Sequence, residues 1–288
     1  MPDRPCRASV SRSLVVLFLV VAALWGLPYA LISVALDHGA GPLLIAWARV
    51  AIGAVILLPL AARRGRLRAL RDHPWTVIAV AVLDIAVPFT ALSLGEQHVS
   101  SSLAGILIAT TPLFVGAMAV MFLPTERPSR RSWAGLALGF AGVVGLFGTG
   151  LNGNAAAAGL VLLAAASYAA ASLLVRARLG GIDALSTGAF ALAIAAVTLA
   201  PGALLERDGH ADATAWVAIG SLGLLCTAAA FALYYELIAR AGATRAALTT
   251  YFSPLLSVPI GALLLGDRLL ASAIFGLALI LTGSWLAR

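Results

Sequence analysis

Two charged residues lie inside stretches that are otherwise apolar, and they are the first candidates for chemistry. Arg49 stands about eight residues into the apolar segment 41–62, and Asp84 stands about ten residues into the segment 74–95. At 1.5 Å per residue of helix, Arg49 lies roughly 12 Å from the outer end and Asp84 roughly 15 Å from the inner face, from which Arg49 is about 20 Å deep. A charge at the centre of a membrane helix costs about 2.5–3.5 kcal/mol, so it faces a partner, a cavity or a substrate path.

These two side chains support several interpretations. They could form an ion pair beside a substrate path, because an extended Arg side chain spans their difference in depth. Arg49 could instead be a purely structural lock between helices. Asp84 could be a strut in that pair or a carboxyl that binds a coupling proton, since an unpaired carboxylate in an apolar setting tends to take up a proton.

Aromatic side chains near these positions are candidates for contact with a substrate. Trp25 and Tyr29 lie on either side of Pro28, in a segment where Gly and Pro together can kink a helix. An aromatic ring at a kink could stack on a substrate or on its cationic group. Trp47 stands two residues before Arg49 and could face either the substrate or lipid.

Prolines inside apolar segments predict helix kinks that could act as gating elements: Pro28, Pro88, Pro112 and Pro254. Each removes one backbone hydrogen bond and leaves a carbonyl without its usual donor. Thr111 precedes Pro112, so its hydroxyl could satisfy such a carbonyl or contact a substrate. Tyr251 stands three residues before Pro254 and shares its face of the helix. Static kinks are the alternative interpretation.

The composition indicates which elements hold these residues. The chain has 288 residues, of which 61% are hydrophobic and 11% charged, and its mean hydropathy is +1.01. A soluble domain has about 25% charged residues, so this chain has too little polar surface for water, and we expect membrane lipid around it. Ten apolar stretches have about the length that crosses a membrane: 13–35, 41–62, 74–95, 99–123, 131–149, 156–175, 184–205, 213–236, 243–265 and 270–287.

Several classes of function are excluded by what the chain lacks. All 19 basic residues are Arg, and without Lys there is neither a Walker A motif nor a Lys Schiff base. Cys6 and Cys226 form no CxxC motif and the four His residues lie far apart, so we predict no cofactor and no metal. The net charge of +7 does not indicate nucleic acid, because the Arg residues flank apolar segments. An integral-membrane enzyme and a non-transporting partner protein stay as alternatives.

The distribution of Arg predicts the orientation in the membrane. With the short tail 1–12 in the cytoplasm, sixteen Arg residues lie in cytoplasmic regions and only Arg207 and Arg268 lie outside. The segment 13–35 has no convincing cleavage site, so we interpret it as an uncleaved first helix. Both termini are expected in the cytoplasm of a multi-pass protein, and the all-Arg usage favours a GC-rich bacterial genome and thus a bacterial inner membrane.

A repeat divides the chain into two halves in one register. The run Gly135-Leu136-Ala137-Leu138 recurs 141 positions later from Gly276, and Pro112-Leu113 recurs 142 positions later as Pro254-Leu255. Five helices per half is an odd number, so the second half is inverted and a substrate site is expected near mid-membrane between the halves. The predicted units are 13–149 and 156–287.

Small residues in the repeated run predict close helix packing. Gly135-x-x-x-Gly139 gives the segment 131–149 a face that favours contact with the last helix, 270–287. Homodimerisation through this face is possible but unsupported by the sequence. Glu96 and Glu236 stand at segment ends and are expected at the membrane interface, with Glu236 as a second candidate for coupling.

Short motifs in order along nearly the whole chain resemble the drug/metabolite transporter superfamily, specifically its EamA-like branch. They are Trp25-Gly26, Arg49, Val99-Ser100-Ser101-Ser102, Thr111-Pro112-Leu113-Phe114, Glu126, the Gly135…Gly142 run, Ser253-Pro254-Leu255, Gly266-Asp267 and the Gly276…Gly283 run. Two loops depart from the pattern, with Asp267 in place of a common Glu and Pro124-Thr125 in place of a small turn.

The resemblance implies an all-α integral membrane protein with ten transmembrane helices in two inverted five-helix repeats. It also implies ATP-independent secondary transport of small organic metabolites or drugs, often export, by alternating access. The expected partners are membrane lipid, a small-molecule substrate and a candidate coupling proton. Neither the resemblance nor the residues identify the substrate.

Overall fold

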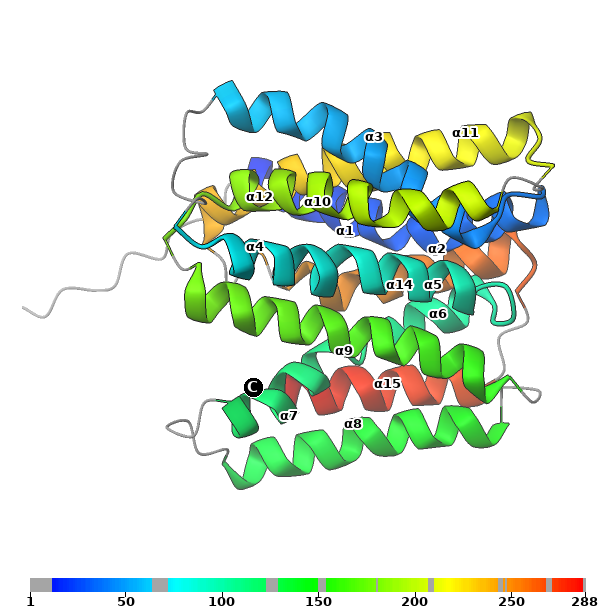
Figure 1. Ribbon diagram of the computed structural model, residues 1–288. Helices are drawn as coiled ribbons and strands as arrows, with labels where there is room; N and C mark the ends of the chain where they lie inside the picture. Colours follow the sequence, from blue (N-terminus) through cyan, green and yellow to red (C-terminus); the bar gives the residue numbers. More distant parts are fainter. Residues whose placement is uncertain are drawn as a thin grey trace, which may run out of the picture.

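The computed structural model describes residues 12–63, 72–122, 129–149, 154–179, 181–206, 210–242, 246, 248–267 and 271–286. All regular secondary structure in these ranges is helical, and the helices run side by side along one common direction (Figure 1). A helix satisfies its own backbone polar groups, which lipid cannot do, so this architecture suits an apolar chain. The expected all-α class is confirmed for the described residues.

The first half of the chain forms α1 (Arg12–Gly26), α2 (Pro28–Asp37), α3 (Pro42–Arg63), α4 (Pro74–Val80), η2 (Ala81–Ala86), α5 (Val87–Gly95), α6 (Ser101–Ile108), α7 (Thr111–Phe122) and α8 (Arg130–Thr149). The second half forms α9 (Ala155–Arg178), α10 (Ala184–Leu205), α11 (Ala213–Ser221), η3 (Leu222–Ala229), α12 (Ala230–Ala241), α14 (Thr249–Leu264) and α15 (Ala271–Leu286). The elements η2 and η3 are π-helical and continue the α-helices on both sides of them.

Seven stretches of the described residues are long and apolar enough to cross a membrane: Arg12–Asp37, Pro42–Arg63, Pro74–Gly95, Ser101–Ala119, Ala155–Arg178, Ala184–Leu205 and Ala213–Ala241. Each coincides with one of the predicted segments. The helices α14 and α15 are apolar but shorter, and α8 occupies the remaining predicted segment. Ten crossings therefore stay a prediction.

Two of the predicted prolines mark breaks between helices. Pro28 begins α2, separated from α1 by Leu27 alone, at a helix position where its missing N–H is not needed. The predicted helix 99–123 is divided into α6 and α7, and Pro112 lies in the first turn of α7. The Thr111 hydroxyl donates a hydrogen bond of 2.7 Å to the Ile108 carbonyl oxygen. This side chain therefore satisfies a backbone acceptor at the break between α6 and α7.

The sequence also predicts a kink at Pro254, the counterpart of Pro112 in the second half. The helix is not interrupted at this proline. The helix α14 runs from Thr249 to Leu264 through both Pro254 and Pro259. It packs against α1 and α6, and such packing can hold a proline-containing helix in a membrane protein. Pro88 is the second residue of α5 and follows η2 directly. The repeat therefore positions its prolines equivalently without giving them equivalent structures.

The two π-helical segments occupy matching positions in the two halves. Adding the repeat distance of 142 residues to η2 gives residues 223–228, which lie inside η3. The contacts are also reciprocal, because α3 packs against η3 and α10 packs against η2. Since π-helical turns are rare and often lie at functional sites, these segments direct attention to what they contact.

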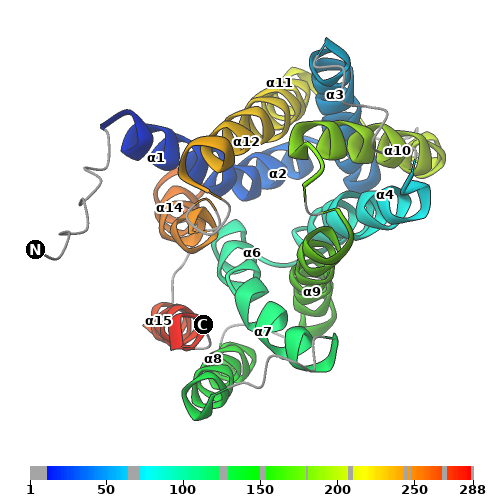
Figure 2. The same cartoon turned by 90° about the vertical axis from the view of Figure 1, so that its left-hand side faces the viewer.

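The repeated glycine runs form the contact between α8 and α15, which lie side by side at one edge of the bundle (Figure 2). A Cβ added at Gly142 would lie 2.9 Å from the Gly276 carbonyl oxygen. A Cβ added at Gly283 would lie 2.5 Å from the Gly135 carbonyl oxygen. The predicted packing of this face against the last helix is confirmed, so the face is already covered within one chain.

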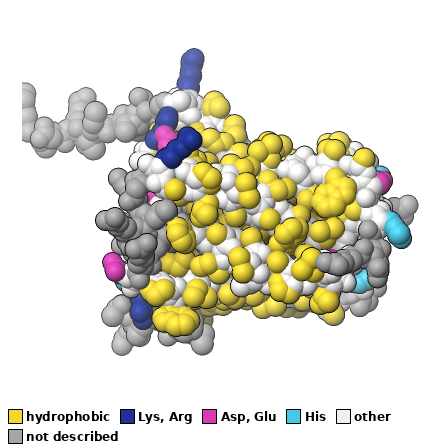
Figure 3. All heavy atoms as spheres, turned by 45° about the horizontal axis from the view of Figure 1, so that its top comes forward, with side chains coloured by type: hydrophobic (Ala, Val, Ile, Leu, Met, Phe, Trp, Pro, Cys, Tyr) yellow, Lys and Arg dark blue, Asp and Glu magenta, His cyan; other side chains and the backbone are white. Residues whose placement is uncertain are grey.

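The flank of the bundle is apolar, and its charged side chains gather at the two ends (Figure 3). Large hydrophobic side chains such as Val55 and Leu263 are 73% and 82% exposed, which suits contact with lipid rather than water. Four Trp side chains at helix ends are also more than half exposed, in the positions of an interfacial belt: Trp75, Trp133, Trp216 and Trp285. The molecule is therefore a multi-pass membrane protein.

Candidate functional site

Arg49 lies in the middle of α3 and is only 3% exposed. Its Nε donates a long hydrogen bond of 3.5 Å to Oγ1 of Thr227, and its Cζ lies 4.0 Å from the centre of the Phe89 ring. No described carboxylate forms an ion pair with it. The guanidinium is thus held by a hydroxyl and an aromatic face, which leaves most of its five N–H donors for another partner.

Small residues bring Arg49 to its contacts in the second half. A Cβ added at Gly53, one turn further along α3, would lie 2.7 Å from Cγ2 of Thr227. Thr227 itself donates its hydroxyl to the Leu222 carbonyl oxygen at 2.9 Å, five residues back in the π-helical segment η3. The absence of a side chain at Gly53 therefore allows α3 and η3 to approach closely at the level of Arg49.

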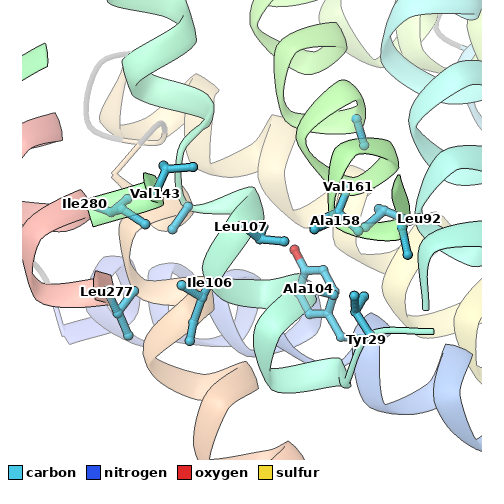
Figure 4. Close-up of a cluster of buried hydrophobic side chains, with 14 of the residues drawn as sticks. Tyr29, Leu92, Ala104, Ile106, Leu107, Val143, Ala158, Val161, Leu277 and Ile280 are labelled. Carbon is cyan, nitrogen blue, oxygen red and sulfur yellow. The ribbon is translucent and has the colours of Figure 1, made fainter. Parts of the chain in front are cut away.

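Two tyrosines complete what we call the central polar cluster: Tyr29, Arg49, Tyr168 and Thr227. Arg49 interacts electrostatically with both tyrosines. Tyr29 is buried and lies among apolar side chains that include Ala104 and Leu107 (Figure 4). The cluster draws its members from α2, α3, α9 and η3, so both halves of the chain contribute to it.

Asp84 lies beyond this cluster and forms no ion pair with Arg49, so the predicted direct pairing is wrong for this structure. It belongs to the π-helical segment η2 and is partly buried. Its electrostatic neighbours are Tyr168, Tyr234 and Tyr235. Tyr168 interacts electrostatically with both Asp84 and Arg49.

Trp25 belongs to a group of aromatic rings that includes Tyr234, an electrostatic neighbour of Asp84. Its ring centre is 4.5 Å from that of Tyr234 and 6.4 Å from that of Phe231, both on α12. Its carbonyl oxygen, at the break between α1 and α2, accepts a hydrogen bond of 2.7 Å from the Ser253 hydroxyl of α14. The structure thus brings Trp25, Tyr29, Arg49 and Asp84 into one interior region.

Two other predicted site residues lie at different helix contacts. Trp47 donates its Nε1 hydrogen bond to the Ala196 carbonyl oxygen at 3.1 Å and connects α3 to α10. Tyr251 donates its hydroxyl to the Ser284 carbonyl oxygen at 3.4 Å and connects α14 to α15. Like Thr111, these side chains contact backbone carbonyls, so a direct role in binding stays a prediction for all three.

Sequence reasoning did not single out Tyr168, Thr227 or Tyr234, and it did not indicate that Glu96 is buried. Glu96 lies at a helix end, as expected, but it is only 6% exposed. A glutamate at the end of an apolar segment looks interfacial, because only the tertiary structure shows that other elements cover it. Tyr and Thr occur in many apolar helices, and nothing in their spacing here distinguished these three.

Three carboxylates of the second half bind the first half at one end of the bundle, on the right in Figure 1. Asp267 Oδ2 accepts hydrogen bonds from the Ser101 hydroxyl at 2.8 Å and from the Ser102 backbone N–H at 2.9 Å. Glu206 Oε2 accepts one from the Leu44 backbone N–H at 2.9 Å. Both acceptors sit at helix N-termini, where negative charge is favourable.

The third of these carboxylates, Asp212, lies 2.7 Å from Nδ1 of His38. Asp212 is also the N-cap of α11, where it accepts a hydrogen bond from the backbone N–H of Ala215. This backbone hydrogen bond and the His38 contact lower the pKa of the Asp212 carboxyl. We call Glu206, Asp212 and Asp267 the carboxylate ties, since each joins the two halves at the same end.

Other surface features do not belong to this site. A shallow groove between α3 and α10 is lined only by apolar residues, among them Ala51, Val55, Pro59 and Ala193. Since Val55 is exposed on the flank, this groove suits an acyl chain of the surrounding lipid. Within the described ranges, no group of three His, Cys, Asp or Glu side chains could hold a metal ion.

Comparisons with known proteins agree with these observations. A solved crystal structure shares the fold with a TM-score of 0.67 at 22% identity, over 96% of this chain and 98% of that chain. The uncharacterised inner membrane transporter YedA of Escherichia coli (strain K12) is 28% identical over 96% of this chain and 94% of its own length. The uncharacterised transporter YoaV of Bacillus subtilis (strain 168) is 27% identical, covering 91% and 92%.

A third relative carries a more specific name. The probable terminal-alkyne amino-acid exporter of Streptantibioticus cattleyicolor is 29% identical over 95% of this chain and 92% of its own length. The family model of the EamA-like transporters matches residues 12–148 and matches again over residues 155–288. The chain therefore belongs to the EamA-like transporter family and is a membrane transporter.

Proposed function

We propose that the protein is a secondary transporter that exports a small organic solute by alternating access, without ATP. The observation that carries the proposal is Arg49, a buried guanidinium between the two halves that no described carboxylate neutralises. Such a residue within a membrane helix faces a substrate path rather than lipid. A negatively charged or hydrogen-bond-accepting group of the solute would supply the partner that the protein does not.

The remaining interior residues are assigned to the same path. Trp25 and Tyr29 offer flat apolar surfaces with polar edges, which suit an organic solute. Asp84, which shares Tyr168 with Arg49 as an electrostatic neighbour, gives the path a carboxylate in addition to a guanidinium. A solute would thus meet a positive and a negative side chain separated by aromatic rings.

The two-repeat arrangement supports alternating access. The family model matches two consecutive segments, and helix contacts recur between the halves: α3 packs on η3 as α10 packs on η2. We propose that these segments are inverted five-helix repeats, together forming ten crossings with both termini in the cytoplasm. In that orientation, which the Arg distribution supports, the carboxylate ties lie at the outer end.

The carboxylate ties support a state that is closed towards the outside. All three join the first half to the second at that one end. Opening the outer side would separate the halves there and expose these carboxylates to water. Export is favoured because one relative is named as a probable exporter of a terminal-alkyne amino acid.

A binding screen followed by flux measurement tests this proposal. Purified protein is heated with individual amino acids, organic acids and drugs, and a ligand that binds the folded state raises its unfolding temperature. Each hit is then assayed for movement across proteoliposomes. We expect flux in wild type and loss of flux in Arg49→Ala, with Arg131→Ala, an exposed residue on α8, as the matched control. A folded protein that moves no solute of a broad panel would contradict the proposal.

A further inference from the structure

Glu96 is a buried carboxyl group with no hydrogen-bond partner. It caps the C-terminus of α5, is 6% exposed, and neither of its oxygens is hydrogen-bonded. Ser93 and Thr90 precede it at steps of three residues, and their hydroxyls are also buried and unpartnered. Residues three apart share a face of a helix, so α5 presents a row of unsatisfied polar groups.

Such a row is costly unless something completes it. A buried polar group without a partner costs about 1–3 kcal/mol, and a charged one costs more. An isolated buried carboxylate usually avoids this cost by binding a proton, because the neutral acid is far less expensive to bury. The position therefore indicates a partner that the protein chain itself does not provide.

The charged and titratable groups around Glu96 come from three other elements. Arg49 on α3 is its positive neighbour, but the guanidinium is directed to Thr227 and Phe89 and forms no ion pair with it. Tyr29 on α2 is its phenolic neighbour. Asp267, which follows α14, is its negative neighbour. An ionised Glu96 would therefore repel the carboxylate that caps α6.

We propose that Glu96 is the proton-binding carboxyl of the transport cycle and that its protonation allows the Asp267 tie to close. This inference rests on the proposed transport function and assigns its coupling ion. In the step, a proton from outer water joins one carboxylate oxygen of Glu96 and forms an O–H bond, and no other bond changes. Loss of that proton restores the negative charge, which destabilises the tie and favours opening.

Other carboxyl groups are less suited to this role. Glu236, the second coupling candidate from the sequence, pairs with Arg240 at 2.7 Å near the end of α12 and is partly exposed. Asp84 lies in η2 among tyrosines, away from the carboxylate ties. Of these three, Glu96 alone has both oxygens buried without a partner, and it lies five residues before Ser101, which donates to the Asp267 tie.

Infrared spectroscopy tests proton binding without any knowledge of the substrate. Acid-minus-base difference spectra are recorded on wild type, on Glu96→Gln and on the matched control Glu236→Gln. We expect a carboxylic-acid C=O band from buried groups that loses intensity in Glu96→Gln and is unchanged in Glu236→Gln. Unchanged intensity in a folded Glu96→Gln variant would overturn the proposal, and circular dichroism with thermal unfolding verifies the fold.

Pulsed electron–electron distance measurements test the link to closure. Spin labels are placed at Gln97→Cys, beside α6, and at Leu264→Cys, on α14, in a background without Cys6 and Cys226. We expect the label distance to lengthen as pH rises in this background, and to stay at the short distance at every pH in Glu96→Gln. A pH response equal to the background in Glu96→Gln would refute the coupling role, whereas the flux of wild type decides separately whether the protein transports.

Discussion

At the scale of single residues, Arg49 is held by contacts that are weak for a guanidinium. One hydrogen bond of 3.5 Å and one aromatic face at 4.0 Å do not repay the removal of a full charge from water. A side chain kept for stability alone would be better replaced by an apolar residue of similar volume. Stability and transport should therefore respond in opposite ways when this charge is removed.

The first prediction concerns Arg49→Met. We expect the variant to be as stable as wild type or up to about 4 kcal/mol more stable, the range seen when buried charged groups are replaced by apolar ones. We expect it to bind the screened solute about 10- to 100-fold more weakly, since a hydrogen bond to a charged group contributes about 1.5–3 kcal/mol. Thermal unfolding in detergent and solute titration measure the two effects. Marked destabilisation with unchanged binding would show a structural lock instead.

The second prediction concerns the pH dependence of Asp212. Its folded pKa is lowered by the Ala215 backbone hydrogen bond and by His38, so the ionised form stabilises the fold. This contribution is present above the unfolded pKa of about 3.9 and is lost as pH falls through the lower folded pKa. Asp212→Asn should therefore unfold at a lower temperature than wild type at pH 7, with the difference shrinking below about pH 4.

Thermal unfolding across this pH range measures the effect. Asp37→Asn, at an exposed position at the same end of the bundle, is the matched control and should follow wild type. If the stability difference between Asp212→Asn and wild type stays the same below about pH 4, the contribution of Asp212 does not depend on its negative charge.

The sequence predicted the charged members of the site better than their partners. Arg49 and Asp84 were visible because a charge in an apolar stretch needs an explanation. Their mutual pairing was wrong, because depth along two helices does not show which faces meet, and the two side chains form no ion pair. The burial of Glu96 was missed because its 6% exposure depends on tertiary packing, which a helix end in the sequence does not reveal.

At the scale of elements, the contact between α8 and α15 depends on the absence of side chains. A Cβ at Gly283 would lie 2.5 Å from backbone atoms of both Gly135 and Gly139, which cannot move as a side-chain end can. A Cβ at Gly145, in the same helix pair, would meet nothing within 4 Å. These two positions therefore form a matched pair for testing the contact.

The third prediction is that Gly283→Ala destabilises the protein by about 1–3 kcal/mol, as overpacking does. Gly145→Ala should be neutral or stabilising by up to about 1 kcal/mol, because Ala is the better helix former. Unfolding in detergent by a chemical denaturant compares the two variants. Equal effects at both positions would show that the glycines are not required for close approach.

The repeated motifs predicted this contact because the same small residues recur on both helices. The interruptions were less predictable. Pro112 lies at a break, while Pro254 in the matching position lies within continuous α14, since the surrounding packing decides the course of the backbone. The π-helical segments have no signature in the sequence, because one extra residue in a helix changes no hydrophobic pattern that a short window can detect.

At the scale of the whole molecule, polar contacts between the halves are unevenly placed. Glu206 and Asp267 both cap helix N-termini of the first half, and Asp212 contacts His38 at the same end. The arrangement gives a closed end made of charge-assisted hydrogen bonds, which water can replace at small cost when the halves separate.

The fourth prediction uses a reversible lock at this end. Ser101 Oγ and Asp267 Oδ2 are 2.8 Å apart, so Ser101→Cys with Asp267→Cys places two thiols across the interface between the halves. In a background without Cys6 and Cys226, we expect oxidation to join them and to abolish solute flux in proteoliposomes. Reduction should restore the flux, and each single Cys variant should show no response to oxidant.

The flux of the cross-linked protein distinguishes alternating access from a fixed pore. Alternating access requires this end to open in every cycle, so a covalent bond there must stop transport while the rest of the protein stays folded. Mass spectrometry confirms that the bond has formed, and thermal unfolding confirms the fold. Full flux through a fully cross-linked protein would show that the solute does not pass between Ser101 and Asp267, and that the closed end is static.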